Sequence, residues 1–67
     1  MTAVQSSNLA GVDYDWQGTL TIAFRSGSVY EYYDVSYSEY AGLMNASSPG
    51  KYFHAHINNR YPCRRVQ

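Results

Sequence analysis

This chain of 67 residues has little of what marks several large classes of protein. It holds a single cysteine, Cys63, so no disulfide can form within it, which favours a reducing compartment. No apolar run approaches the roughly 20 residues that cross a bilayer. The first residues also lack the basic and apolar regions of a secretory signal. We therefore expect a soluble, cytoplasmic protein with one domain over residues 1–67.

The sequence also lacks the common signatures of catalysis and metal binding. It contains no phosphate-binding loop, no Gly-x-Ser-x-Gly turn and no zinc-ligand spacing. His54 and His56 are two residues apart, and on a helix they diverge by about 200°, too far to bind one metal ion. Cys63 follows a proline and has no base beside it, so we expect an inert thiol. These absences predict a protein that is not an enzyme and that uses no cofactor or metal.

Asp13 and Asp15 leave two interpretations open. On a strand they would share a face, where they could hold a divalent ion or divide acid and base roles between them. In a loop they would be ordinary turn residues, and this is the interpretation that we favour.

Charge is divided unevenly along the chain, although the formal net charge is zero. Residues 1–50 hold all five acids and one base, Arg25, whereas residues 51–67 hold the other four bases and no acid. This asymmetry indicates a basic surface for an anionic partner. A solvated helix end is the alternative, because basic side chains suit the negative end of the helix dipole.

Patterns of apolar and polar residues predict three strands. The segment "TLTIAFR" alternates, with Leu20, Ile22 and Phe24 on one face, as in a half-buried strand. A short strand is predicted before it at residues 9–14 and another after it at residues 29–35. Glycine-containing turns separate the three segments.

Two helices are predicted to follow the strands. "SYSE" is a capping box in which Ser36 accepts from the backbone of Glu39, while the Glu39 side chain reaches back. In "SSPGK", Ser48 caps a second helix that begins at Pro49. Pro62 is expected to end this second helix.

The predicted fold class is α+β. A three-stranded antiparallel β-meander is followed by two helices packed on one face of the sheet. Tyr37 and Tyr40 share the apolar face of the first helix with Leu43, so we assign both tyrosines to the core. Residues 1–6 and 63–67 are expected to be frayed.

The segment "VYEYYDVSYSEY" holds five of the eight tyrosines, and the phase of the third strand decides what they do. We expect Tyr30 and Tyr32 to face the helices, because Glu31 then stays in water. Tyr33 in that case stands on the open face of the sheet as an exposed stacking ring. A shift of one residue in the strand would reverse this arrangement.

The ordered series "SSNLAGVDYD", "LTIAF", "SGSVYEYYDV", "Y..LMNAS..GKYF" and "I...Y" resembles the KTSC domain, a family named for the C-terminus of some lysyl-tRNA synthetases. The resemblance covers residues 6–61 and includes the family's Tyr-x-Tyr motif at residues 30–32. It implies a small module that also occurs as stand-alone bacterial and phage proteins, and for which RNA binding has been suggested. Ser36 stands where the family often has proline, and His54 where it often has asparagine.

Together these observations predict a small non-catalytic module that binds RNA or single-stranded nucleic acid. A basic C-terminal helix would contact phosphates, and exposed rings such as Tyr33 and Trp16 would stack on unpaired bases. The predicted contact residues are Tyr33, Lys51, His54, Arg60, Arg64 and Arg65. The alternative is a phage-type inhibitor that binds a host protein, or that sequesters a nucleotide signal as a homo-oligomer.

Overall fold

Alternation of apolar and polar side chains builds the central strand, β3 (Leu20–Phe24). In the computed structural model, which describes residues 1–67, Leu20 and Ile22 are fully buried on one face of this strand. Strand β3 pairs antiparallel with β2 (Leu9–Tyr14) on one side and with β4 (Val29–Tyr32) on the other. The three predicted strands are therefore present, although the third ends at Tyr32 and not at residue 35.

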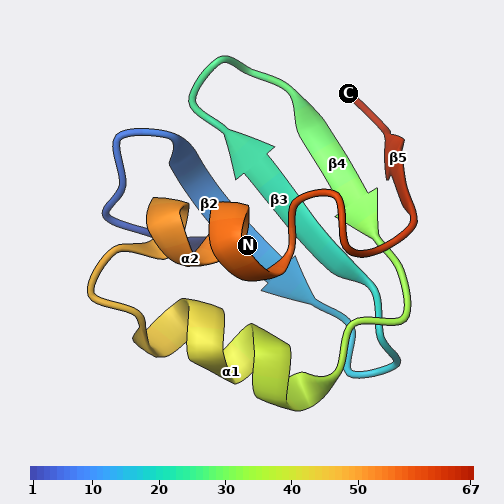
Figure 1. Ribbon diagram of the computed structural model, residues 1–67. Coiled ribbons are helices and arrows are strands. Elements are labelled where there is room, and N and C mark those ends of the chain that lie inside the picture. The colour runs from blue at the N-terminus through green and yellow to red at the C-terminus, as the bar shows by residue number, and fades with distance from the viewer.

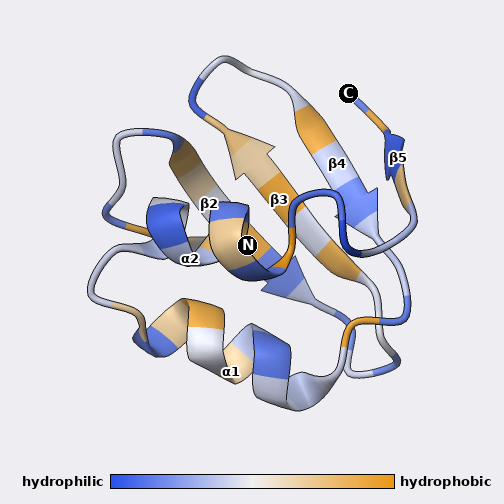
Figure 2. Cartoon of the chain, in the orientation of Figure 1, coloured by the Kyte–Doolittle hydropathy of each residue, from blue (hydrophilic) through white to orange (hydrophobic).

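The sheet has five strands, however, and the prediction of three was wrong at both of its edges. The strand order is β1-β2-β3-β4-β5, where β1 is Thr2–Ala3 and β5 is Cys63–Arg65. All three residues of β5 are exposed, and Figure 2 shows this strand as largely hydrophilic. Backbone pairing with β4 holds it, so no apolar pattern in the sequence indicates a strand there.

A β-bulge interrupts the pairing of β2 with β3. Leu9 lies opposite Phe24, and Gly11 lies opposite the next residue of β3, Ala23, so Ala10 is the extra residue. Because of this extra residue, Leu9 and Val12 both face the core although they are three positions apart.

Both helices lie on the same face of the sheet (Figure 1) and begin where the sequence predicts. Helix α1 (Tyr37–Asn45) is capped by Ser36, whose Oγ accepts from the Glu39 backbone N–H at 3.3 Å. Helix α2 (Pro49–His56) is capped by Ser48 in the same way. Neither helix is long and apolar enough to cross a membrane.

Helix α2 ends at His56, six residues before the predicted stop at Pro62. The backbone N–H groups of Ile57 and Asn58 both donate to the carbonyl oxygen of Phe53, at 2.9 Å each. Asn59 then takes a left-handed conformation with φ 64°. Asparagine tolerates this conformation better than most residues, so the "NN" pair ends the helix before the proline does.

The core lies between the sheet and the two helices. Phe53 of α2 is 2% exposed, and its ring meets those of Phe24 and Tyr32 edge-on, each at 5.5 Å between centroids. The buried hydrophobic residues come from every element except the two edge strands. They are Leu9, Val12, Tyr14, Leu20, Ile22, Tyr32, Val35, Leu43, Phe53 and Ile57.

The tyrosines divide between core and surface mainly as predicted, except for Tyr37 and for Tyr33, which is on the open face but only partly exposed. Tyr32 is 4% exposed, and Tyr30 packs against the core from the same face. Tyr40 is partly buried and stacks on Tyr14 at 4.7 Å. The prediction for Tyr37 was wrong, because it is 56% exposed. Tyr37 is the first residue of α1, and its ring lies against Trp16 in the turn before β3 and against Tyr40.

Glu39 does not complete the predicted capping box but joins three segments of the chain. Its carboxylate accepts from the hydroxyl of Tyr52 in α2 at 2.6 Å and from that of Tyr61 at 3.1 Å. His56 Nδ1 lies 3.9 Å from the same carboxylate. The Glu39 side chain therefore points away from the N-terminus of α1 and links α1 to α2.

Alkaline pH is expected to weaken the fold. The hydrogen bond to Glu39 raises the pKa of Tyr52 to about 12, and burial raises the pKa of Tyr32 to about 12. In the unfolded chain both hydroxyls ionise near 10. Between about pH 10 and 12 the unfolded state has thus lost protons that the folded state keeps, and the free energy of unfolding decreases.

Denaturant titrations across this pH range would measure the effect. We expect Tyr52→Phe, which removes one of the two hydroxyls, to make the decrease shallower. A free energy of unfolding that stays constant from pH 10 to 12 would contradict the assignment.

Candidate functional site

The residues that the sequence predicts as contacts are divided between two faces of the molecule. Lys51 and His54 lie on α2, on the helical side of the sheet. Tyr33 and Arg64 meet at Glu31 on the open face. The six predicted residues therefore do not form one surface.

On the open face, Glu31 binds two of the six predicted contact residues, Tyr33 and Arg64. The Tyr33 hydroxyl donates to Glu31 Oε1 at 2.8 Å, and this bond raises the pKa of Tyr33. Arg64, directly opposite Glu31 in the β4–β5 register, places a guanidinium nitrogen 3.5 Å from the same oxygen. Arg64 thus offsets the charge of Glu31, and the Tyr33 hydroxyl is bonded to the same carboxylate, an arrangement that disfavours a phosphate at this point.

The C-terminal tail, which was predicted to be frayed, forms strand β5. Because side chains alternate along a strand, Arg64 and Arg65 point to opposite faces of the sheet. Arg65 lies opposite Tyr30, and its Nε donates to the backbone oxygen of Gln67 at 3.2 Å. Arg60 is exposed in the turn after α2.

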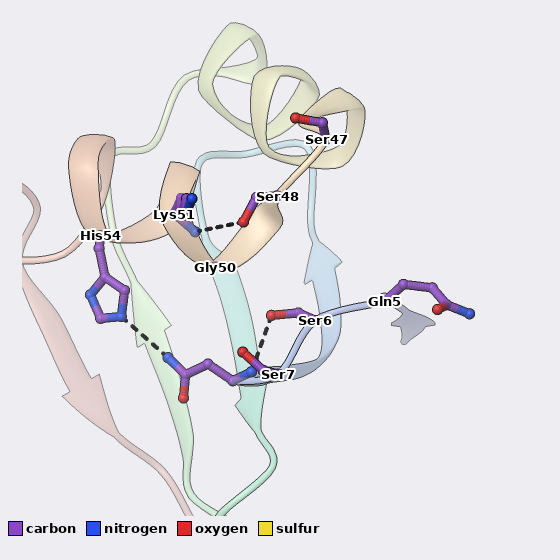
Figure 3. A pocket seen from close by; sticks show the side chains of 9 residues that line it. Gln5, Ser6, Ser7, Ser47, Ser48, Gly50, Lys51 and His54 are labelled. Atoms are coloured by element: carbon purple, nitrogen blue, oxygen red, sulfur yellow. Dashed lines mark hydrogen bonds between the residues drawn. The ribbon is translucent and has the colours of Figure 1, made fainter.

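A polar hollow lies between the start of α2 and the segment that leads into β2 (Figure 3). Its volume is about 370 Å³. Lys51 and His54 reach it from α2, and serine hydroxyls line much of the rest. The lining residues are Gln5, Ser6, Ser7, Asn8, Ser47, Ser48, Gly50, Lys51 and His54.

An aromatic hollow of about 400 Å³ lies next to it, between the end of α2 and strands β3 to β5. Rings from the sheet and from α2 form its apolar part, and amides, hydroxyls and a thiol form its polar part. The lining residues are Asn8, Phe24, Ser26, Ser28, Tyr30, Tyr32, Phe53, His54, Asn58, Asn59 and Cys63.

Asn8 and His54 belong to both hollows and separate them. Asn8 Nδ2 lies 3.3 Å from His54 Nε2. Local hydrogen bonds fix Asn8, because its backbone N–H donates to Ser6 Oγ at 3.1 Å and its carbonyl accepts from the Arg25 backbone N–H at 2.9 Å. The His54 ring meets the Phe53 ring edge-on at 5.4 Å. The contact between Asn8 and His54 thus forms a wall that the two hollows share, and we call the two together the paired hollows.

No aspartate or glutamate lines the paired hollows. Their volumes fall in the range of small-ligand sites, about 300–1,000 Å³. An anionic group in the polar hollow would meet the Lys51 ammonium and serine hydroxyls without a competing carboxylate. In the aromatic hollow, a planar group would find ring faces with the amides of Asn58 and Asn59 beside them.

Sequence reasoning included Lys51 and His54 in the site but missed the rest of the paired hollows. Asn8, Tyr30 and Cys63 come from segments far apart in the chain, and each is an unremarkable residue in its own segment. The one available signal in the sequence was the pair Asn58 and Asn59, because these two amides directly follow Ile57, the apolar residue that caps α2.

The remaining candidates for metal or acid–base chemistry lie apart. Asp15 Oδ1 accepts from the backbone N–H groups of Thr19 at 2.9 Å and Gln17 at 2.8 Å, and these bonds lower the pKa of Asp15. Asp15 is a turn residue, as we favoured, whereas Asp13 lies within strand β2, contrary to that interpretation. No three His, Cys, Asp or Glu side chains lie close enough together to hold a metal ion.

Comparisons with known proteins agree on one family. The sequence profile of the KTSC domain matches residues 5–61. Lysine–tRNA ligases of Trichormus variabilis and Nostoc punctiforme are each 49% identical to this chain over 43 residues, which are 64% of this chain and 8% of each ligase. The chain therefore spans a small part of these curated relatives.

A solved structure extends the likeness to the whole fold. The crystal structure of a KTSC domain protein from Yersinia pestis superposes with a TM-score of 0.94 at 30% sequence identity. The match covers 98% of this chain and 94% of the other.

Proposed function

The chain belongs to the KTSC domain family, and from the form of its surface we propose that it is a non-catalytic module that binds single-stranded RNA in the paired hollows. One observation carries the proposal. An aromatic hollow and a polar hollow with a lysine adjoin each other, and neither contains an acid. A nucleotide has the matching parts, a flat base and a phosphate.

The charge distribution supports a single strand rather than a duplex. Lys51 is the lysine of the polar hollow, whereas Arg60 is exposed in the turn after α2 and Arg65 is exposed on β5. Two or three cations make few phosphate contacts, whereas proteins that grip duplexes often make about 6–10. Unpaired bases can instead enter a hollow and stack on tyrosine rings.

The curated relatives lend this proposal further support. Their names describe lysine–tRNA ligases, so the related segment occurs in proteins that act on tRNA. A tRNA offers unpaired nucleotides in its loops and at its end.

We expect Lys51→Gln to weaken binding of a fluorescein-labelled RNA of about eight nucleotides by several fold. The loss of one phosphate contact should also make the salt dependence shallower, by about 0.7 in the slope of log K against log [salt] for a single strand. Arg64→Gln is the matched control, because Arg64 is an exposed base on the other face, paired with Glu31. Fluorescence anisotropy at several salt concentrations measures both variants.

Tyr30→Leu tests the aromatic hollow separately. Leucine keeps apolar contact with the core but removes the ring, and base stacking is worth about 1–3 kcal/mol. We expect at least about a fivefold loss of affinity. Equal losses for Lys51→Gln and Arg64→Gln, with none for Tyr30→Leu, would mean that RNA binds by general charge alone and would refute the site.

A free nucleotide is the second candidate, because hollows of about 370 and 400 Å³ suit one nucleotide as well as part of a chain. Titration with a nucleoside monophosphate and with RNAs of increasing length separates the two. Affinity that rises with length supports RNA, whereas full affinity for the mononucleotide supports a role in sequestering a nucleotide.

A further inference from the structure

A second surface lies at the opposite end of β3 from Arg25 and has a different character. Trp16 is 68% exposed, and its ring stacks on that of Tyr37, with centroids 5.3 Å apart and planes 22° apart. The ring of Tyr40 meets Trp16 edge-on at 5.9 Å. We call Trp16, Tyr37 and Tyr40 the aromatic shelf.

The turn before β3 holds Trp16 outward. Trp16 has a φ of 68°, a left-handed conformation that is rare for a bulky residue. Asp15 fixes the turn through its bonds to the N–H groups of Gln17 and Thr19. Figure 1 shows this turn beside the start of α1. The Val35 backbone N–H donates to the carbonyl oxygen of Gly18 at 2.9 Å and ties the two segments together.

Two aspartates flank the aromatic shelf. Asp15 directly precedes Trp16, and Asp34 lies three residues before Tyr37 with its Cα against the turn at Gly18. Both aspartates are exposed. No Lys, Arg or His occurs in residues 1–24 or 26–50, and Arg25 donates from its Nε to the Ser6 backbone at the far end of β3.

We propose that the aromatic shelf docks a basic, extended peptide segment, with an arginine or lysine side chain stacked on the exposed rings. Exposed aromatic faces attract cations, and tryptophan does so most strongly. The two aspartates add charge of the complementary sign, which steers a basic partner and repels phosphates. This surface is separate from the paired hollows, and its partner has the opposite charge.

Trp16 is the only tryptophan in the chain, so its fluorescence reports occupancy of the aromatic shelf directly. The probe is a capped peptide of alternating glycine and arginine, titrated into the full chain at low salt. The control peptide carries citrulline in place of arginine, which keeps the shape and removes the charge. We expect a saturable change with the arginine peptide and none with the citrulline peptide.

Two variants test the geometry. Tyr37→Ala removes the stacking partner from an exposed position, and we expect roughly a fivefold loss of affinity for the arginine peptide. Asp34→Asn removes one charge while keeping a residue that tolerates the φ of 61° found there, and we expect roughly a threefold loss. Glu31→Gln removes the same charge from the open face and should change affinity little.

Other results would overturn the proposal. Equal responses to the two peptides would mean that charge is not recognised. A saturable response to single-stranded RNA that matches the response to arginine would indicate a nucleic-acid surface. A change in Trp16 fluorescence on dilution of the protein alone would identify a second copy of the chain as the occupant.

Discussion

Phe53→Ala is expected to leave the domain largely unfolded at room temperature. The side chain is 2% exposed and lies between α2 and the sheet, in contact with the rings of Phe24 and Tyr32. Truncation of a buried phenylalanine typically costs about 3–5 kcal/mol. A single core in a chain of this length rarely supplies more than about 3–5 kcal/mol in total. One substitution therefore removes most of the stability.

Urea denaturation followed by circular dichroism measures this effect. Phe53→Leu should lie between the wild type and the alanine variant, because it keeps most of the apolar volume. Lys51→Ala, an exposed change in the same helix, should stay within about 0.5 kcal/mol of the wild type. A loss of less than about 1.5 kcal/mol for Phe53→Ala would show that the core can close around the cavity.

Gly42→Ala is expected to destabilise the domain, although helix propensity alone favours alanine by about 1 kcal/mol. A Cβ at position 42 of α1 would overlap the hydroxyl of Tyr52 and lie 2.6 Å from its Cζ. The Tyr52 ring cannot move away freely, because its hydroxyl is bonded to Glu39. Overpacking of this kind costs about 1–3 kcal/mol. We expect a net loss of up to about 2 kcal/mol after the propensity gain.

A double-mutant cycle with Tyr52→Ala isolates the cause. Once the ring is gone, Gly42→Ala should become neutral or stabilising by up to about 1 kcal/mol. The pKa of Tyr52 should also fall toward its ordinary value in Gly42→Ala alone, because the displaced hydroxyl loses Glu39. Stabilisation by Gly42→Ala in the wild-type background would contradict the close packing of the two helices.

Local patterns in the sequence predict most of the fold. The alternation around Ile22 marks the central strand because one face must be apolar, and Ser36 and Ser48 mark the helix starts because capping is a local interaction. The edge strands escape detection for the opposite reason. Cys63–Arg65 buries no side chain, and it is held by backbone pairing with β4 and by one exposed ion pair, Arg64 with Glu31. Neither interaction gives the apolar alternation that indicates a strand.

The site is less predictable because it depends on tertiary packing. A helical pattern places Tyr37 on the apolar stripe but cannot show that its ring lies on Trp16 and stays 56% exposed. A charge count finds Arg64 and Arg65 but not that β5 turns them to opposite faces. The Asn8–His54 bridge joins residues 46 positions apart, and no local pattern brings them together.

The bulge at Ala10 gives β2 a tolerance for change in chain length. Without Ala10, Leu9 would still face the core and Gly11 would still face outward, because the regular alternation would simply resume. The core thus has no need of the extra residue. The bulge instead affects the segment that precedes β2. A bulge bends its strand, and this bend sets the direction of the chain at Asn8, which contacts His54. We therefore expect deletion of Ala10 to change the affinity for a ligand in the paired hollows more than it changes the stability of the fold.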